Sequence, residues 1–178
     1  MTDLATTLVL GGARSGKSAF AERLVIESGL ARIYLATATA DDEEMKARIA
    51  HHRAQRGQGW TTIEEPLVLV DALTREATHG RAVLVDCLTL WLSNLMLAGR
   101  DPEIEARRLT RFLGVARYPV IFVSNEVGLG LVPDTPLGRR FRDAQGRLNQ
   151  IMAAAVPDVV FIAAGLPLWL KRSSPTES

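Results

Sequence analysis

The chain has 178 residues, of which 47% are hydrophobic and 23% charged, and its formal net charge is +1. This length suits one globular domain, which we expect over residues 1–171 with a flexible tail at 172–178. Such a charge excludes a broad electrostatic grip on nucleic acid or anionic membrane, although it allows a local phosphate site. No apolar run reaches the ~18 residues of a membrane span, and the start "MTDLATTLVLGG" lacks the basic region of a signal peptide. We therefore expect a cytoplasmic protein.

Short apolar runs rich in β-branched residues alternate with longer amphipathic segments. Continuous apolar runs are typical of strands that are buried on both faces of a parallel sheet. We expect such strands at residues 6–10, 31–37, 82–86, 120–124 and 159–164, a further strand at 60–65 and an edge strand at 167–171. We expect helices at 17–28, 42–56, 66–78, 88–98, 102–117 and 135–155. This alternation predicts an α/β fold with a mostly parallel central sheet and helices on both faces.

The sequence "GGARSGKS", residues 11–18, directly follows the first expected strand. It fits the phosphate-binding pattern G-x-x-x-x-G-K-[ST], with the strand before it and the helix after it that the pattern requires. In such a P-loop, backbone amides and the helix dipole face the phosphates, Lys17 reaches the β- and γ-phosphates, and Ser18 binds Mg²⁺. A glycine turn that only caps a helix does not explain Lys-Ser at this spacing. The predicted nucleotide-binding residues are Gly11, Gly12, Ala13, Arg14, Ser15, Gly16, Lys17 and Ser18, in a P-loop NTPase-like three-layer fold.

Asp86 ends the expected strand 82–86, where a carboxylate would hold the Mg²⁺ of a bound nucleotide. An alternative is that Asp86 caps the following helix, since Asp is favoured at that position. With the phosphate loop present we favour the metal role, so Ser18 and Asp86 are the predicted metal ligands. The next residue, Cys87, is the only cysteine, so it forms no internal disulfide and is expected to be a buried thiol.

Two of the three histidines, His51 and His52, are adjacent in "RIAHHRAQRG". At about 100° per residue, Met45, Ile49 and His52 share one helical stripe, whereas His51 projects from the polar face. The pair does not suit a zinc site, because adjacent helical side chains diverge and His79 lies in an expected loop. From spacing alone, a solvated helix face is the favoured interpretation.

Several blocks change this interpretation because they occur together and in order. They are "GGARSGKS", "YLATATADDEEMKARIAHHRAQR", "WTTIEEP", "VLVDCLTLWLSNL", "SNEVGLGLVPDTPLGRRFRDAQGRLNQ" and "AAGLPLWLK". With them the chain resembles the adenosylcobinamide kinase/adenosylcobinamide-phosphate guanylyltransferase family of cobalamin biosynthesis, over about residues 6–171. Many enzymes share the phosphate loop, but the histidine block and "SNEVGLGLVP" are far more specific.

The resemblance implies that His51 is a nucleophile and, with Lys17, a catalytic residue. His51 would attack the α-phosphorus of GTP, expel pyrophosphate and pass GMP to adenosylcobinamide phosphate, giving adenosylcobinamide-GDP. The same protein would first phosphorylate adenosylcobinamide with ATP or GTP, and would form a homotrimer. A neutral imidazole, with its ordinary pKa of ~6.5, needs little activation for such an attack. The further nucleotide-site residues that the resemblance implies are Thr37, Ala38, Thr39, His52, Arg53, Ala54, Gln55 and Glu64, of which the usual position of ligands at strand ends independently favours Thr37.

Some alternatives stay open from the sequence. The chain could be a P-loop small-molecule kinase without a covalent step, or a nucleotide-responsive regulatory module. Glu126 fits a metal or proton-transfer role and a loop-anchoring hydrogen bond equally well, and the segment 88–98 fits either an interface or the core. For Arg139, Arg140, Arg142 and Arg147, a solvated face is favoured over contact with the substrate phosphate or a neighbouring subunit. Trp60, Trp91 and Trp169 are expected in the core or at an interface and not as a platform that stacks on the corrin ring.

Overall fold

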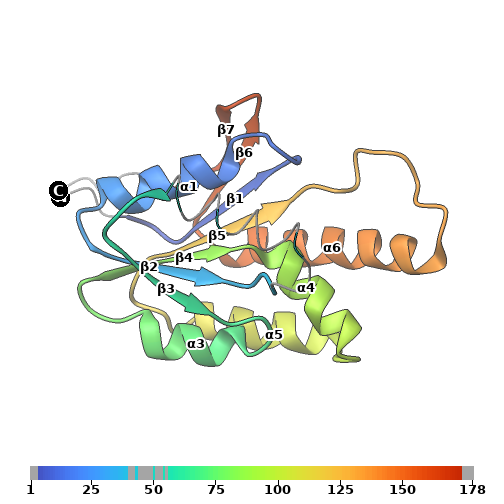
Figure 1. Cartoon of the computed structure of the whole chain (residues 1–178), viewed down its shortest axis with the longest axis horizontal. Coiled ribbons are helices and arrows are strands. Elements are labelled where there is room, and N and C mark those ends of the chain that lie inside the picture. Colours follow the sequence, from blue (N-terminus) through green and yellow to red (C-terminus); the bar gives the residue numbers. More distant parts are fainter. Residues whose placement is uncertain (1–3, 40–42, 44–49, 51–53, 55, 174–178) are drawn as a thin grey trace.

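The computed structural model describes residues 4–39, 43, 50, 54 and 56–173. Its strands form one seven-stranded sheet in the order β3-β2-β4-β5-β1-β6-β7 (Figure 1). β1 to β6 run parallel, and only β7 is antiparallel, to β6. The strands are β1 (Thr7–Gly11), β2 (Ala31–Ala36), β3 (Trp60–Glu64), β4 (Arg81–Asp86), β5 (Val120–Asn125), β6 (Asp158–Ala163) and β7 (Leu166–Lys171). The predicted parallel sheet, the additional strand and the edge strand are confirmed.

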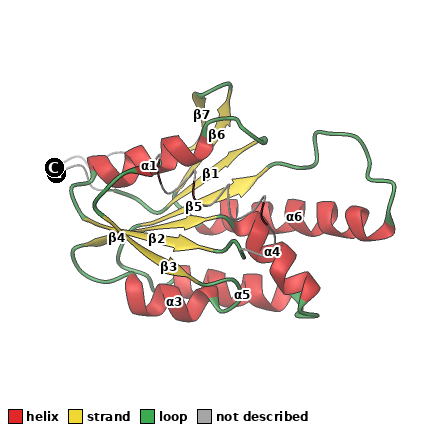
Figure 2. Cartoon of the chain, viewed as in Figure 1, coloured by secondary structure: helices red, strands yellow, loops and turns green. Residues whose placement is uncertain are grey.

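Helices cover both faces of the sheet, as the sequence predicts (Figure 2). α1 (Lys17–Glu27) lies on one face, and the other face carries four further described helices (Figure 1). These are α3 (Leu69–Glu76), α4 (Leu88–Leu97), α5 (Pro102–Leu113) and α6 (Pro136–Ala155). The result is a three-layer α/β architecture.

Two apolar cores follow from the alternation of side chains along the buried strands. In β1, for example, Leu8 and Leu10 pack toward α3–α6, whereas Val9 packs toward α1. Trp91 of α4 is fully buried in the larger core. The apolar segment at 88–98 therefore contributes mainly to the core.

α1, α4 and α6 differ from the predicted bounds by one residue, whereas α3 and α5 are shorter by several residues for reasons visible at their ends. α3 begins at Leu69 and not at 66, because the Glu65 carboxylate accepts hydrogen bonds from the preceding amides of Leu67 and Val68 (3.1 and 2.8 Å). α5 begins where Asp101 caps it but ends at Leu113, where Gly114 occupies the C-cap position, and not at 117. The predicted helix 42–56 falls mostly outside the described residues, although the described positions 43, 50, 54 and 56 are helical.

None of the described helices combines the length and the apolar character needed to cross a membrane.

Candidate active site

The phosphate loop joins β1 to α1 in the geometry that the pattern requires. Gly16 has a left-handed backbone (φ 95°) immediately before α1, which a residue without a Cβ adopts at little cost. Lys17 is the first residue of α1, and its Nζ donates a hydrogen bond to the carbonyl oxygen of Gly12 at the start of the loop (3.1 Å). The loop thus surrounds an amine that can exchange a backbone carbonyl for a phosphate oxygen.

Close packing against the β6–β7 turn supports the loop. The amide of Gly165 in that turn donates to the carbonyl of Ser15 (2.8 Å). A Cβ at Gly11 would lie 2.5 Å from Ser15 Oγ and 2.7 Å from the Ile162 carbonyl oxygen. A glycine is therefore required at position 11, because the side chain of Ser15 and the backbone of β6 leave no room for a Cβ.

Parallel pairing brings the ends of five strands to the same edge of the sheet. Gly11 of β1 pairs in register with Asn125 of β5, and the amide of Glu126 donates to the Gly11 carbonyl (3.0 Å). Ala36 of β2 pairs with both Asp86 of β4 and Glu64 of β3. The predicted loop, Asp86 and Glu64 thus share the edge where an open α/β sheet builds its ligand crevice.

Asp86 does not cap α4, because Cys87 occupies the N-cap position and no side chain provides the cap. Instead, Asp86 Oδ2 accepts a hydrogen bond from the hydroxyl of Tyr34 on the neighbouring strand (2.8 Å). The helix-cap alternative for Asp86 is therefore wrong. The carboxylate is held from one side by a buried phenol.

Thr37, directly after β2, is fully buried and joined to Cys87. Its Oγ1 donates to the Cys87 carbonyl (2.7 Å) and accepts from the Cys87 amide (2.8 Å), while Asn94 Nδ2 donates to the Thr37 carbonyl (2.8 Å). The Thr37 hydroxyl is thus occupied within the protein. Through it, the end of β2 fixes the start of α4.

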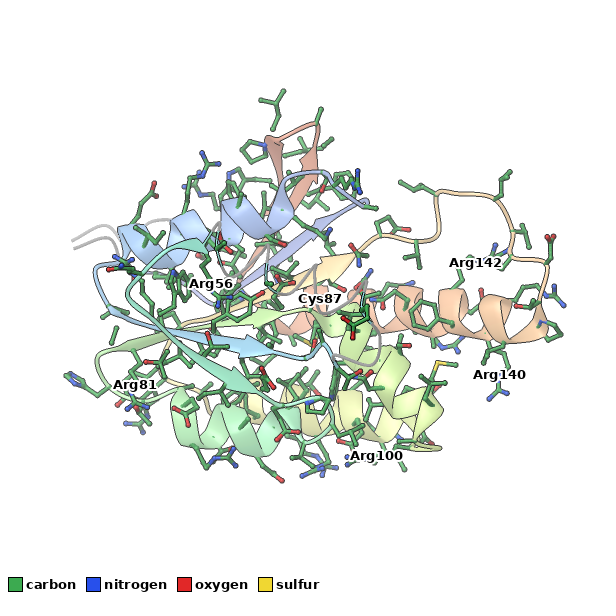
Figure 3. The ribbon with its side chains drawn as sticks, viewed as in Figure 1. Arg56, Arg81, Cys87, Arg100, Arg140 and Arg142 are labelled. Atoms are coloured by element: carbon green, nitrogen blue, oxygen red, sulfur yellow. The ribbon has the colours of Figure 1, made fainter. Side chains whose placement is uncertain are left out.

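Sequence reasoning missed a cluster beside Asp86 that contains Arg56, Tyr34, Trp60 and Glu22. The guanidinium carbon of Arg56 lies 3.4 Å from the centroid of the Tyr34 ring, and Arg56 Nη2 donates to Thr62 Oγ1 (2.9 Å). Trp60 meets the Tyr34 ring edge-on, with 6.1 Å between centroids. In Figure 3, both Arg56 and Cys87 lie in the interior of the molecule. The sequence gives no periodic signal for this cluster, because Arg56 reads as part of a polar segment and Tyr34 as an ordinary core residue.

Burial dominates the protonation of the groups around Asp86. Burial raises the pKa of the half-buried Glu22 carboxyl. The Arg56 guanidinium lowers this pKa, and the charge of Asp86 raises it. Burial, followed by the charge of Asp86, also raises the pKa of the Cys87 thiol to about 11. Cys87 is therefore the buried thiol that the sequence predicts.

Ser18 and Asp86 could hold a magnesium ion together with a nucleotide. Mg²⁺ is usually bound by one or two carboxylates, a P-loop hydroxyl and substrate phosphates, and not by a cage of protein ligands. The described residues contain no group of three or more His, Cys, Asp or Glu side chains that could hold a metal alone. One hydroxyl beside Lys17 and one carboxylate at the adjacent strand ends are hard oxygen donors that suit this ion.

The remaining predicted nucleotide-site residues divide into two groups. Ala38 and Thr39 follow β2 and are half-buried, Glu64 ends β3 and is exposed, and Ala54 is helical and exposed. The predicted nucleophile and its neighbours, His51, His52, Arg53 and Gln55, lie outside the described residues.

Glu126 serves at least as a loop anchor, because its carboxylate accepts a hydrogen bond from the amide of Gly128. The arginines of α6 are largely used locally. Arg139 donates to the carbonyls of Pro133 and Asp134, and Arg147 lies 3.9 Å from Glu103. Arg140 and Arg142 lie on the half of α6 that projects beyond the sheet, away from Arg56 (Figure 3).

A buried polar network behind the edge was also missed. Ser124 of β5 bonds to Asn149 and Gln145 of α6 (2.7 and 2.9 Å), and Asn149 Nδ2 donates to the carbonyl of Asn125 (3.0 Å). Only the helical spacing of Gln145 and Asn149 on one face could have suggested it. The network fixes α6 to the strand end next to the phosphate loop.

Comparison with known proteins agrees with this geometry. A type III secretion ATPase structure superposes with a TM-score of 0.55 at 10% identity, covering 93% of this chain and 56% of that one, which indicates a shared P-loop fold. A relative from Pseudomonas aeruginosa, "Bifunctional adenosylcobalamin biosynthesis protein CobP", is 53% identical over 92% of this chain and 96% of its own. The Escherichia coli "Bifunctional adenosylcobalamin biosynthesis protein CobU" is 37% identical over 92% of this chain and 98% of its own. Residues 7–170 match the family described as "Cobinamide kinase / cobinamide phosphate guanyltransferase", and the chain belongs to this family.

Proposed function

We propose that this chain phosphorylates adenosylcobinamide with ATP or GTP and then transfers GMP from GTP to adenosylcobinamide phosphate, through a guanylyl group on His51. Membership of the family makes the chain a kinase and guanylyltransferase of cobalamin biosynthesis. The substrates and the covalent intermediate are our proposal. The observation that carries it is the packing of Arg56, five residues after His51, beside Asp86 at the edge that bears the phosphate loop.

The loop residues Gly11 to Ser18 would bind the triphosphate. Backbone amides and the N-terminus of α1 face anionic oxygens, and Lys17 would leave the Gly12 carbonyl for a phosphate. Thr37, Ala38, Thr39, His52, Arg53, Ala54, Gln55 and Glu64 would complete the nucleotide site. Because the triphosphate is fixed by rigid backbone, the α- and γ-phosphorus atoms have defined positions relative to the strand ends.

Ser18 and Asp86 would hold Mg²⁺ with the nucleotide. When bound, this ion neutralises charge that develops on the phosphate oxygens. The protein's own contribution is orientation, since Tyr34 occupies Asp86 Oδ2 and thereby fixes the plane of the carboxylate.

The guanylyl transfer would proceed in two displacements. An imidazole nitrogen of His51 attacks the α-phosphorus of GTP, so that an N–P bond forms, the P–O bond to pyrophosphate breaks and pyrophosphate leaves. A phosphate oxygen of adenosylcobinamide phosphate then attacks the same phosphorus, which forms the new anhydride and returns the electron pair of the N–P bond to the imidazole. Lys17 and the loop amides would stabilise the charge on the departing pyrophosphate.

The reaction products test this function directly. Purified protein is incubated with Mg²⁺, GTP and adenosylcobinamide, and the corrinoids are separated and identified by mass. We expect adenosylcobinamide phosphate to form first and adenosylcobinamide-GDP to follow, with one pyrophosphate released per GDP-corrinoid. Formation of the phosphate alone would indicate a kinase without the covalent step, and nucleotide binding without either product would indicate a regulatory module.

We also propose that the chain forms a homotrimer. Leu166 and Leu168 alternate along the edge strand β7 and are 72 and 61% exposed, and Leu170, at the bulge opposite Val159 and Val160, is 58% exposed. Alternate residues of a strand share one face, and an exposed apolar edge strand suits contact with another copy. Light scattering after size-exclusion chromatography should give three times the 19.4 kDa chain mass, whereas the mass of a single chain would contradict the proposal.

A further inference from the structure

Arg56 is buried to an extent unusual for an arginine in a polar segment. Only 8% of the residue is exposed, and its Nε is buried without a hydrogen-bond partner among the described residues. Burying a guanidinium with an unpaired donor opposes stability. Its position is held by the face of the Tyr34 ring and by Thr62 Oγ1. Because the buried, unpaired Nε of Arg56 opposes stability, we expect this residue to have a role other than stability.

Tyr34 contacts Arg56 and Asp86 through different parts of its side chain. Its face carries the Arg56 guanidinium at 3.4 Å, and its hydroxyl donates to Asp86 Oδ2 at 2.8 Å. Trp60 packs edge-on against the same ring, which restricts its rotation. The tyrosine therefore fixes the relative positions of residues 56 and 86, although they belong to distant parts of the sequence.

Arg56 also limits where His51 can be. Five residues of chain span at most about 18 Å, even when fully extended. The Cα of His51 can therefore lie no farther than about that distance from the Cα of Arg56, whose side chain packs on Tyr34.

We propose that Arg56 and Tyr34 are positioning residues for guanylyl transfer: Arg56 holds the segment that carries His51, and Tyr34 holds both Arg56 and the metal-side carboxylate of Asp86. This inference rests on the proposed function. Covalent attack needs the nitrogen about 3–3.5 Å from the phosphorus, and a displacement of about 1 Å can slow such a step by about 100-fold. Phosphoryl transfer to the corrinoid does not use His51, so it should depend much less on Arg56.

Two variants separate the two contacts. Arg56→Met removes the guanidinium but keeps an unbranched side chain, and Tyr34→Phe keeps the ring beneath Arg56 but removes the hydroxyl that holds Asp86. Arg172→Met is the matched control, because Arg172 also lies over an aromatic ring, that of Trp169 (4.6 Å), but at the end of the edge strand. Thermal unfolding of each variant would be recorded to confirm folding.

The readouts are the rate of labelling by α-labelled GTP, the rate of phosphoryl transfer, and Mn²⁺ binding by electron paramagnetic resonance with GTP present. We expect Arg56→Met to slow labelling by at least about tenfold at saturating GTP, with a much smaller effect on phosphoryl transfer and on Mn²⁺ affinity. We expect Tyr34→Phe to weaken Mn²⁺ binding severalfold and to slow both reactions, with recovery at higher Mg²⁺. Arg172→Met should match the wild type.

Equal loss of both reactions in Arg56→Met would overturn the inference, since it would indicate a general structural role. Unchanged Mn²⁺ affinity in Tyr34→Phe would equally overturn it. If the wild-type protein itself takes up no α-label, the proposed function fails. If the wild type is labelled and Arg56→Met is labelled at the same rate, only the present inference fails.

Discussion

Thr37 and Cys87 form a reciprocal pair of hydrogen bonds across the ends of β2 and β4. The threonine hydroxyl donates to the Cys87 carbonyl (2.7 Å) and accepts from the Cys87 amide (2.8 Å). Both partners are buried, so neither backbone group can bond to water instead. One side chain thus joins the strand that ends near the predicted nucleotide site to the residue that follows Asp86.

Replacing Thr37 tests the importance of this pair. Thr37→Val keeps the shape but leaves the buried amide of Cys87 unpaired, whereas the Cys87 carbonyl still accepts from the Trp91 amide (3.1 Å), so we expect the free energy of unfolding to fall by about 1–3 kcal/mol. Thr37→Ser retains the hydroxyl and serves as the control, with a smaller loss. Urea denaturation measures both, and equal stability of the valine and serine variants would show that the hydroxyl bonds contribute little.

Two adjacent glycines of the phosphate loop should differ in their tolerance of an added methyl group. In Gly11→Ala the Cβ would lie 2.5 Å from Ser15 Oγ and 2.7 Å from the Ile162 carbonyl, so we expect a loss of about 1–3 kcal/mol in stability. A Cβ at Gly12 would meet nothing within 4 Å, so Gly12→Ala should change stability by less than about 0.5 kcal/mol. Thermal unfolding compares them, and a destabilised Gly12→Ala beside a stable Gly11→Ala would contradict the loop geometry.

The Cys87 thiol should be unreactive in the folded protein. Burial raises its pKa to about 11, so at pH 8 only about one thiol in a thousand is the reactive thiolate. Alkylation by iodoacetamide at pH 8 should therefore be much slower in native protein than in urea. Comparable rates would show that the thiol is accessible.

The same pKa predicts a change in stability at high pH. Between about pH 9 and 11 the unfolded chain loses the thiol proton and the folded chain keeps it, so the free energy of unfolding should fall as pH rises. Below about pH 9 both states keep the proton, and this contribution is constant. Cys87→Ala should show a shallower decline over that range.

Lys17→Met should abolish both activities. The lysine is the loop's only side-chain amine, and removal of one charged donor to a transferring phosphate typically costs about 100-fold or more in rate. We expect phosphoryl transfer and GTP-dependent labelling each to fall by at least about 100-fold, with the fold retained by circular dichroism. Near-normal rates would mean that the nucleotide binds elsewhere.

Glu126→Gln separates the two interpretations of that residue. Glutamine can still accept the hydrogen bond from the Gly128 amide, so we expect both reactions to stay within about threefold of the wild type if the carboxylate only anchors the loop. Glu126→Ala, which loses the anchor, is the comparison. A large loss of phosphoryl transfer in Glu126→Gln, with labelling retained, would instead assign a metal or proton-transfer role.

The sequence predicts the sheet and the phosphate loop because both follow from local patterns. Continuous β-branched runs indicate buried parallel strands, and Gly11 to Ser18 carry a motif whose spacing has a direct physical reason. The start of α3 and the end of α5 were predicted less accurately, because they depend on the Glu65 side chain and on Gly114. Such capping contacts shift a boundary by a few residues without changing the hydrophobic pattern.

The cluster around Asp86 could not be predicted for a different reason. Tyr34 reaches Asp86 because β2 pairs with β4, and it lies beside Arg56 and Trp60 because β2 also pairs with β3, which follows Arg56 in the chain. These contacts have no periodicity in the sequence. The alternative that Asp86 caps α4 also required the structure, because Asp is a common cap and only the backbone shows that Cys87 holds that position. Long-range side-chain contacts are thus what the sequence alone left open.

The most direct test of the central claim is covalent labelling at His51. Protein is incubated with Mg²⁺ and GTP labelled at the α-phosphate, denatured and assayed for label on the chain, beside γ-labelled GTP, His51→Ala and the control His79→Ala, which alters an exposed histidine in a turn. The account predicts acid-labile, alkali-stable α-label on the wild type and on His79→Ala, no label on His51→Ala, and none from γ-labelled GTP. Absence of α-label from wild-type protein that demonstrably binds GTP, or persistence of the label in His51→Ala, would contradict it.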